Sequence, residues 1–562
     1  MQKTTDSSKS NAIAELSPAP VDKFQQAFNL HQQGQLEQAD VLYTELLKEQ
    51  PQHIDALHFS GVLANQCGQA QRAVDLISLA LEIDASNAAA HSNLGLALYA
   101  LSRFDEALAS YNKALALKPS NAETHYNCGN ALLALSRFNE ALTRYNQVLT
   151  IKPDYADAHW GASWCYLSLG IFDRGWKEYE WRWQTNDFKN YVRNFSKPQW
   201  FGEESLQGKT ILLHNNEQGL GDTLQFCRYA KRVADLGARV ILEVPKTLLG
   251  LLAKLEGVTQ LITQGGVLPA FDFHCPLLSL PLAFKTHLDS IPVNNPYLFS
   301  EPDKVKHWQA VLGEKTKPRV GLVWAGNAVH KNDRNRSLAL HELLPLLMPH
   351  CQFISLQKEP CDTDKELLAQ QPLLQHYCEQ INDFTDTAAL CELMDLVISV
   401  DTSVAHLAAA MGKPTWILLP YNPDWRWLID REDSPWYPTA RLFRQKQHGD
   451  WQGVIECVQR ELVNLPALAR PIIEVSQRNQ PVSNHIELFS QALSLHQQGQ
   501  LEHAEVLYEQ QLKNQPQHID ALHFLGVLVN QRGQSQRAVE LISQALEIAP
   551  NNAAAHSNLG LA

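Results

Sequence analysis

The sequence predicts an α plus α/β chain in three parts: a helical solenoid, two consecutive α/β lobes, and a shorter second solenoid. A 34-residue repeat predicts the solenoids, and short apolar strands alternating with glycine turns and helices predict the lobes. The length of 562 residues exceeds what one hydrophobic core usually organises. With 45% hydrophobic and 19% charged residues, the composition is that of a globular protein.

The 34-residue period places small and aromatic residues at fixed positions. The recurring positions are Ala39, Ala73, Ala107 and Ala141, then Tyr43, Ile77, Tyr111 and Tyr145, with Ala27, Gly61, Gly95 and Gly129 upstream. Two antiparallel helices per repeat explain this pattern, because small residues allow the helices to touch and a large residue fills the groove. Pro51, Pro119 and Pro153 then open the following turn. The pattern resembles the tetratricopeptide repeat.

A degenerate fifth unit follows these four repeats. Gly170 and Tyr179 keep the pattern, whereas Gly175 replaces the small alanine. The unit ends in GWKEYEWRW, which predicts a capping repeat that seals the solenoid against the next domain. We therefore assign residues 1–19 to a disordered N-terminus and residues 20–183 to a five-repeat solenoid.

The end of the chain repeats its beginning. Residues 489–562 match residues 24–97 at 56 of 74 positions, which indicates a recent duplication. We assign residues 464–484 to a linker and residues 485–562 to a second, truncated array. The sequence stops at Ala562 inside a repeat, so we expect a fragment or a shortened tandem protein.

Two α/β lobes are predicted between the repeats. Residues 184–207 lack any period and are assigned to a connector. In residues 208–305, TILLHN and ARVILEV predict strands that flank a helix over TLQFCRYAKRVADLG. In residues 317–463, strands are predicted at PRVGLVWAG, CQFISLQ, LVISV and PTWILLPY, and helices at HELLPLLMPH, TAALCELM and DWQGVIECVQREL. Such paired lobes bind ligands in the cleft at the carboxyl edges of their strands.

Charge and cysteine usage exclude several classes of protein. The formal net charge of −13 argues against a general nucleic-acid binder, although a small phosphate pocket needs only one or two cations. The ten cysteines occur singly with no C-x-x-C pair, which argues against zinc ribbons and thioredoxin-like sites. The first residues lack an apolar signal core, and no run approaches about 18 apolar residues. We therefore expect a cytoplasmic protein without a transmembrane segment.

Three segments carry candidate site residues. In VISVDTSVAHLAAAMGKP, a strand ends at Asp401 and a helix starts within 402–404, so free amides there form either an anion site or an ordinary capped helix. In QGLGDTLQF, Gly219 and Gly221 allow close approach of a ligand, and Asp222 is either a helix cap or a carboxylate that takes a proton from a hydroxyl.

The third segment is VWAGNAVHKNDRNRSLAL. This polar loop after a strand could place a cation over a diphosphate, although most of its four cationic side chains fit a solvated loop. Those side chains are His330, Lys331, Arg334 and Arg336. We select Arg336 because Ser337 and an apolar helix follow it directly.

These segments and their order resemble family 9 glycosyltransferases, the ADP-heptose:lipopolysaccharide heptosyltransferases. ILLHNNEQGLGDTLQ resembles the family's opening, and DTSVAHLAAAMGKPTWILL resembles its D-T-G-x-x-H-x-A-A-x-x-x-x-P segment; together they span about 208–463. With the repeats, the chain is similar to bacterial repeat-fused glycosyltransferases, whose layout resembles that of protein O-GlcNAc transferases.

The resemblance implies a GT-B fold of two Rossmann-like lobes and an inverting, metal-independent transfer from a nucleotide sugar, with no cofactor. Asp222 matches the family's proposed base. The donor-binding candidates are Gly219, Gly221, Gly326, Asn327, Arg336, Asp401, Thr402, Ser403 and His406. Ser403 stands where the family usually has glycine, and Arg336 replaces a phosphate-binding lysine. Because the heptosyltransferases lack the repeats, heptose and lipopolysaccharide are not carried over as substrates.

Other features leave alternatives open. The Trp-rich segment 421–437 could wall a sugar pocket or pack between the lobes. The only D-x-D run is Asp362–Asp364, far along the chain from the proposed base, so no metal site is expected. The pairs His53/His58 and His518/His523 recur with the repeats and are assigned to the solenoid surface rather than to metal binding.

Three functions fit this sequence. The main hypothesis is an enzyme that transfers a sugar to a hydroxyl, with a protein or peptide acceptor on the concave face of the repeats. The second is a scaffold whose repeats bind proteins while the core is catalytically inactive. The third is an epimerase-like enzyme of the same fold that has no transfer acceptor.

Overall fold

The computed structural model describes residues 22–215, 219–293, 296–329, 332–463, 492, 496, 501–549 and 558–560. It divides into two compact units, Met1–Ala469 and Arg470–Ala562. The expected disordered N-terminus, the expected linker and the first residues of the second array lie outside the described residues, as do His330 and Lys331.

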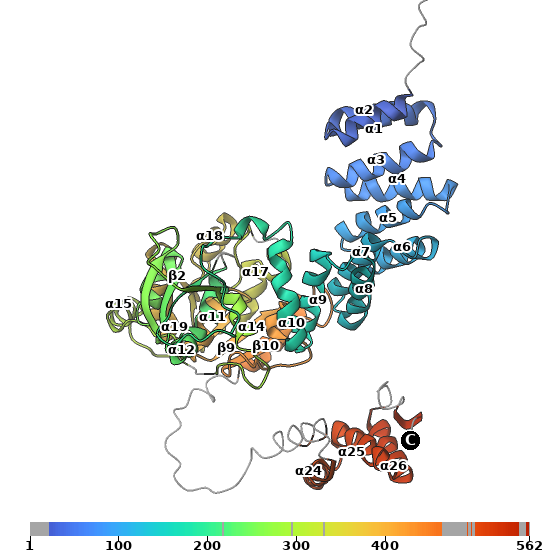
Figure 1. Ribbon diagram of the computed structural model, residues 1–562. Helices are drawn as coiled ribbons and strands as arrows, with labels where there is room; N and C mark the ends of the chain where they lie inside the picture. Colours follow the sequence, from blue (N-terminus) through green and yellow to red (C-terminus); the bar gives the residue numbers. More distant parts are fainter. Residues whose placement is uncertain are drawn as a thin grey trace, which may run out of the picture. The chain divides into compact units, whose positions relative to one another are not determined.

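Five helix pairs form the first solenoid, coloured blue to teal in Figure 1. They are α1 (Lys23–Gln32), α2 (Leu36–Glu49), α3 (Ile54–Gln66), α4 (Ala70–Ile83), α5 (Ala88–Ala100), α6 (Phe104–Leu117), α7 (Ala122–Ala134), α8 (Phe138–Ile151), α9 (Ala156–Ser168) and α10 (Phe172–Tyr179). The predicted groove filling is present: a Cβ atom on Gly95 would lie 2.4 Å from the Tyr111 ring, and one on Gly129 would lie 2.7 Å from the Tyr145 ring. In these two repeats glycine is therefore required where the ring of the second helix lies against the first helix, whereas the first repeat has Ala27 at this position.

Histidines link and cap the repeats. The Nε2 atoms of His91, His125 and His159 lie 2.8–3.0 Å from the carbonyl oxygens six residues upstream, at the junction with the preceding repeat. His53 is the N-cap of α3 and accepts a hydrogen bond from the amide of Ala56. These histidines hold the solenoid together, because each satisfies backbone groups at a repeat junction.

The first lobe is a four-stranded parallel sheet with strand order β3-β2-β1-β4. Its elements are β1 (Thr210–His214), α11 (Leu220–Phe226), α12 (Tyr229–Asp235), β2 (Arg239–Val244), η3 (Lys246–Leu248), α13 (Leu249–Leu252), β3 (Val258–Thr263), β4 (Phe273–Pro276), η4 (Leu277–Ser279) and α14 (Leu280–Ala283). The single helix predicted over TLQFCRYAKRVADLG is wrong, because the chain breaks it at Cys227 and Arg228. There the Arg228 guanidinium donates to the carbonyl of Gln225 and reaches across to the carbonyl of Trp436.

The second lobe is a six-stranded parallel sheet with strand order β10-β9-β8-β5-β6-β7. Its elements are α15 (Pro302–Leu312), β5 (Arg319–Val323), α16 (Asp333–Arg336), α17 (Leu340–Leu343), η5 (Leu344–Leu346), β6 (Gln352–Ser355), α18 (Asp362–Ala369), β7 (Leu374–His376), η6 (Cys378–Gln380), α19 (Phe384–Leu393), β8 (Leu396–Val400), α20 (Ser403–Ala410), β9 (Thr415–Leu419), η7 (Trp425–Trp427), β10 (Ala440–Arg444) and α21 (Trp451–Leu462). The helix predicted over HELLPLLMPH is reduced to α17 and η5, because Pro345 cannot continue an α-helix.

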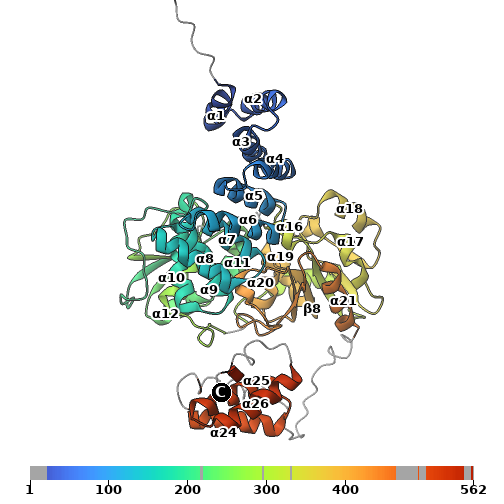
Figure 2. The ribbon, with the colours of Figure 1, turned by 90° about the vertical axis from the view of Figure 1, so that its right-hand side faces the viewer.

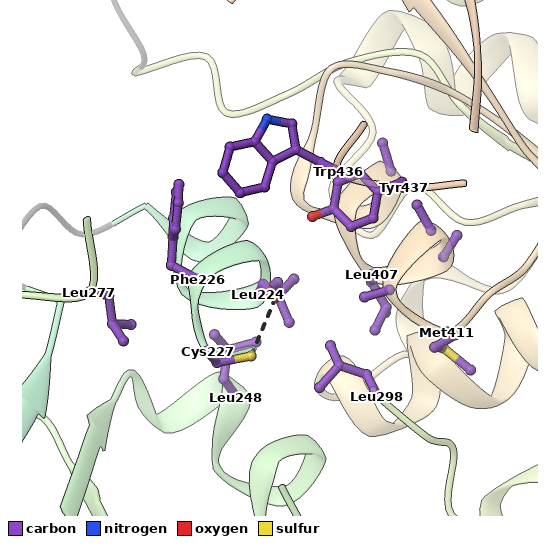
Figure 3. Close-up of a cluster of buried hydrophobic side chains, with 14 of the residues drawn as sticks. Leu224, Phe226, Cys227, Leu248, Leu277, Leu298, Leu407, Met411, Trp436 and Tyr437 are labelled. Carbon is purple, nitrogen blue, oxygen red and sulfur yellow. Dashed lines mark hydrogen bonds between the residues drawn. The ribbon is translucent and has the colours of Figure 1, made fainter. Parts of the chain in front are cut away.

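One hydrophobic cluster joins the two lobes. Leu224 and Phe226 of α11 and the following Cys227 belong to the same cluster as Leu407 of α20 and the following Met411, and Figure 3 shows these two groups facing each other. Helix α15 adds to the second lobe, since the Trp308 indole donates to Asp386 of α19 over 3.1 Å. The lobes therefore share a continuous apolar core.

The fifth repeat packs into the same core. Phe172, Trp176 and Tyr179 of α10 belong to the cluster that joins the lobes. The Trp176 indole, 2% exposed, donates to the carbonyl oxygen of Thr286 in the first lobe over 2.9 Å. The connector then begins as two short turns, η1 (Glu180–Gln184) and η2 (Lys189–Tyr191). This packing is the one expected of a repeat that seals the solenoid against the next domain.

The second unit contains α24 (Leu501–Asn514), α25 (Ile519–Gln531) and α26 (Ser535–Ile548), which are labelled in Figure 2. His518 caps α25 through the amide of Ala521, just as His53 caps α3 in the first solenoid. Among the described residues of the whole chain, no helix has the length and apolar character needed to cross a membrane.

Candidate functional site

Three neighbouring strands of the second lobe end at one edge of its sheet. Because β5, β8 and β9 are adjacent and parallel, the loops that follow them lie side by side. These loops carry Arg336, Asp401 and Arg426 respectively. The site is assembled at the carboxyl edge, as expected for a sheet of this kind.

Helix α20 begins directly after Asp401. Thr402 occupies the N-cap position with φ −138°, but its side chain makes no capping hydrogen bond. Its hydroxyl lies instead 3.0 Å from the Ser399 hydroxyl, and Ser403 is the first helical residue. The simple capping interpretation is therefore wrong for Thr402. Within the described part of the chain, the first amides of α20 have no side-chain cap, as an anion site requires.

Asp401 and His406 lie together at the start of α20. The His406 Nε2 atom is 3.8 Å from Asp401 Oδ1, and its Nδ1 atom is 2.9 Å from the Tyr437 hydroxyl. Burial, together with the nearby Asp424 carboxylate, raises the pKa of the Asp401 carboxyl to about 6 against the lowering effect of Arg336. Burial lowers the pKa of His406 well below its usual value, and Arg426 and other nearby arginines lower it further. The imidazole is thus neutral and can donate or accept one hydrogen bond at Nε2.

Arg336 reaches the same place from the loop after β5. Its Nη1 atom donates to the carbonyl oxygen of Asp401 over 3.0 Å, and its Nε atom donates to Asp333 over 3.3 Å. A Cβ atom on Gly326 would lie 2.6 Å from Arg336 Nη2, so only glycine lets the guanidinium lie over this turn. Asn327 is exposed and its side chain accepts from the Val329 amide, so the structure does not bring it to the group.

Asp222 approaches from the first lobe. It is the third residue of α11, whose N-cap is Gly219, so the alternative of Asp222 as an N-cap is wrong. Its Oδ1 atom accepts a hydrogen bond from Arg426 Nη2 over 2.5 Å. The two glycines permit this arrangement: a Cβ on Gly219 would lie 1.9 Å from Asp222 Oδ2, and one on Gly221 would lie 2.9 Å from His406 Cδ2.

Sequence reasoning missed Arg426, which lies at the centre of the group. Its side chain is 8% exposed and also donates to Asp424 over 2.8 Å. Burial lowers the pKa of this guanidinium, but Asp424 and Asp222 raise it by more, so its pKa stands above the ordinary value. The sequence shows Arg426 only as a cation in the loop after a predicted strand, and this position does not indicate that its side chain turns toward Asp222.

The Trp-rich segment 421–437 packs between elements, one of the two alternatives. Trp436 lies against the Phe226 ring of the first lobe at 5.6 Å, and Trp427 stacks on His406 at 5.2 Å. The two aspartates of the D-x-D run have different partners. Asp364 accepts a hydrogen bond from the Trp324 indole, whereas Asp362 is exposed and pairs with Lys365. Among the described residues, no group of three or more His, Cys, Asp or Glu side chains could hold a metal ion.

Comparison with protein families gives two kinds of match. Residues 381–424, which run from just after η6 through α20 and β9 to Asp424, match glycosyltransferase family 9 (heptosyltransferase). Residues 95–136, 129–162 and 495–560 match tetratricopeptide repeats. The chain joins tetratricopeptide repeats to a glycosyltransferase family 9 segment. This segment contains Asp401 and His406 but neither Asp222 nor Arg426.

Individual proteins resemble parts of the chain. Protein FlbA of Caulobacter vibrioides is 27% identical over 305 residues, which cover 50% of each sequence, so the match spans about half the length of this curated relative. Among solved structures, MamA aligns with 30% of this chain and 97% of its own at 20% identity and a TM-score of 0.27. A thermophilic TPR protein of Thermus thermophilus aligns with 29% of this chain and 90% of its own at 20% identity and a TM-score of 0.26.

Proposed function

We propose that this chain is an inverting, metal-independent glycosyltransferase that moves a sugar from a nucleotide diphosphate to a hydroxyl group. The family 9 match supports a glycosyltransferase at the level of the family. The observation that carries the finer proposal is the ion pair between Asp222 of the first lobe and Arg426 of the second, with Gly221 close against His406 of α20. Arg336 binds the Asp401 carbonyl at the start of the same helix. A base on one side and an anion site on the other are what such a transfer needs.

The reaction follows from these roles. Asp222 takes the proton of the acceptor hydroxyl as the oxygen attacks the anomeric carbon. The bond between that carbon and the diphosphate oxygen breaks, and the nucleoside diphosphate leaves with the bonding electrons. Attack from the side opposite the leaving group inverts the anomeric centre. Arg336 and the free amides of α20 stabilise the charge that develops on the diphosphate.

The repeats supply the acceptor surface in this proposal. Tetratricopeptide repeats present extended concave faces that suit protein or peptide ligands. The cytoplasmic location inferred from the sequence stays a prediction.

A screen of the full chain against nucleotide sugars tests the proposal. A donor that binds only the folded protein raises its melting temperature, and transfer or slow hydrolysis then releases the nucleotide diphosphate. We expect one donor class to raise the melting temperature and to support nucleotide release that EDTA does not abolish. Loss of activity in EDTA, restored by a divalent cation, would contradict metal independence.

One observation favours the scaffold alternative. Arg336 and Arg426 already bind carboxylates or backbone carbonyls within the described structure, so a donor diphosphate has to compete with them. If no nucleotide sugar binds while the repeats still bind a protein partner, the scaffold is the correct function.

A further inference from the structure

The fifth repeat differs from the others in what its groove-filling ring touches. Tyr111 and Tyr179 occupy the same position of the 34-residue repeat. Both rings are buried, with 0% and 3% of their surface exposed. Tyr111 lies against the glycine of its own repeat, whereas Tyr179 lies 6.1 Å from the ring of Trp425 in the second lobe, nearly perpendicular to it. The Trp176 ring of the same repeat also packs against Trp425, with the two ring centroids 5.3 Å apart.

Trp425 connects that repeat to the candidate site. It is 1% exposed, and the Arg426 guanidinium lies over its ring at 4.3 Å. The Phe226 ring, one turn after Asp222 on α11, lies 5.7 Å from the same guanidinium. The Arg426 guanidinium thus contacts one aromatic ring from each lobe, Phe226 and Trp425. The Trp425 ring in turn packs against the fifth repeat.

The final contact is the ion pair itself. Arg426 donates one hydrogen bond to Asp222 and one to Asp424, which fixes the plane of its guanidinium. A planar group with two carboxylate partners and a stacked ring has little freedom to rotate. The orientation of the Asp222 carboxylate is therefore set by Arg426 and, one step further, by the fifth repeat.

We propose that the fifth repeat positions the Asp222 carboxylate for catalysis through Trp425 and Arg426. This inference rests on the proposed function, because it assigns Arg426 as a positioning residue for the base of that reaction. It makes the last repeat part of the catalytic unit, in addition to its place in the solenoid.

A double-mutant cycle tests the link between Arg426 and Asp222. We expect Arg426→Ala to lower kcat at least tenfold while the dissociation constant of the donor changes less than twofold, and Arg426→Lys to recover part of the loss. In an Asp222→Asn background, Arg426→Ala should have almost no further effect on kcat, because both changes remove the same arrangement. A tenfold weaker donor affinity with unchanged kcat would instead make Arg426 a donor ligand and overturn the proposal.

Matched tyrosine variants test the role of the repeat. Tyr179→Leu and Tyr111→Leu remove equivalent buried rings, so both should lower the melting temperature. Only Tyr179→Leu should lower kcat, by about the factor seen for Arg426→Lys. Equal kcat values for the two leucine variants would contradict the proposal. If Tyr179→Leu fails to fold, Tyr179→Met and Tyr111→Met, which keep more of the side-chain volume, replace the leucine pair in the same comparison.

A chemical measurement separates this inference from the proposed function. Carbodiimide labelling of carboxyl groups, mapped by mass spectrometry, should modify Asp222 slowly in the full chain and at least fivefold faster in Arg426→Ala. Faster labelling in Tyr179→Leu but not in Tyr111→Leu would show the link even in a chain that transfers no sugar. Equal Asp222 labelling in all four proteins would overturn the inference whether or not the chain is an enzyme.

Discussion

Replacing Asp222 with asparagine tests the proposed base most directly. Asparagine keeps the shape of the side chain and an oxygen that can accept from Arg426, but it carries no charge and takes no proton. The loss of a general base typically lowers a rate by about 10²–10⁴. We therefore expect kcat to fall within that range, with donor affinity nearly unchanged.

The cost in stability can be worked from the ion pair. Asp222 is 24% exposed, and its partner Arg426 keeps a second carboxylate in Asp424. A hydrogen bond to a charged partner contributes about 1.5–3 kcal/mol, and a neutral one about 0.5–1.5 kcal/mol. Asp222→Asn should therefore lower the free energy of unfolding by only about 1–1.5 kcal/mol, and the melting temperature by a few degrees.

Nucleotide release gives the turnover of each variant, and thermal unfolding of the same samples gives its melting temperature. Asp362→Asn is the matched control, because Asp362 also lies in the first turn of a helix but is 95% exposed and pairs only with Lys365. That control should leave turnover and melting temperature unchanged. Turnover of Asp222→Asn within threefold of the wild type would refute the assignment of the base, whatever its stability.

Three further predictions concern the donor site, its charges and the repeats. Arg336→Ala should weaken donor binding by about 1.5–3 kcal/mol in calorimetry, since a hydrogen bond to a charged partner is lost, and unchanged affinity would remove Arg336 from the site. The raised pKa of Asp401 means that its contribution to stability is present below about pH 4 and is lost as the pH rises to about 6, by on the order of 3 kcal/mol. Asp401→Asn should therefore gain stability relative to the wild type over that range in chemical denaturation, and a constant difference would contradict the pKa. A chain that begins at residue 152 should bind the donor as the full chain does. A chain that begins at residue 184 should fail to fold, because it lacks Trp176 and Tyr179 of the shared core. Normal folding of this shorter chain would show that the fifth repeat is dispensable.

The repeats and sheets could be predicted because their signals are local. The 34-residue period fixes which glycine meets which ring, and the structure has Gly95 against Tyr111 as the period requires. The strand before Asp401 is apolar except for Ser399 and is buried on both faces, which is typical of a central parallel strand. The start of α20 beside a carboxylate followed from that strand alone.

The centre of the candidate site could not be predicted because it depends on contacts between distant residues. Asp222 and Arg426 are 204 positions apart, and no local pattern shows that a cation in a Trp-rich loop turns toward the other lobe. The contact at the break between α11 and α12 is also long-range, since the Arg228 side chain donates to the carbonyl of Trp436, 208 positions away. Asn327 lies away from the group for a different reason, because its side chain accepts a hydrogen bond from the Val329 amide within a local turn.

The apolar core shared by the lobes limits how substrates can enter. Rotating one lobe away from the other would expose Leu224 and Leu407, together with Phe226 and Met411, which are all at most 6% exposed. Uncovering four such side chains costs about 6–12 kcal/mol, at about 1.5–3 kcal/mol each. A fully opened state would then be populated in fewer than about one molecule in 10⁴, since each 1.4 kcal/mol is a factor of ten. Under the proposed function, substrates would therefore reach the site by small movements of its loops. The dissociation rate of a bound nucleotide should then depend little on solvent viscosity, because no whole lobe has to move.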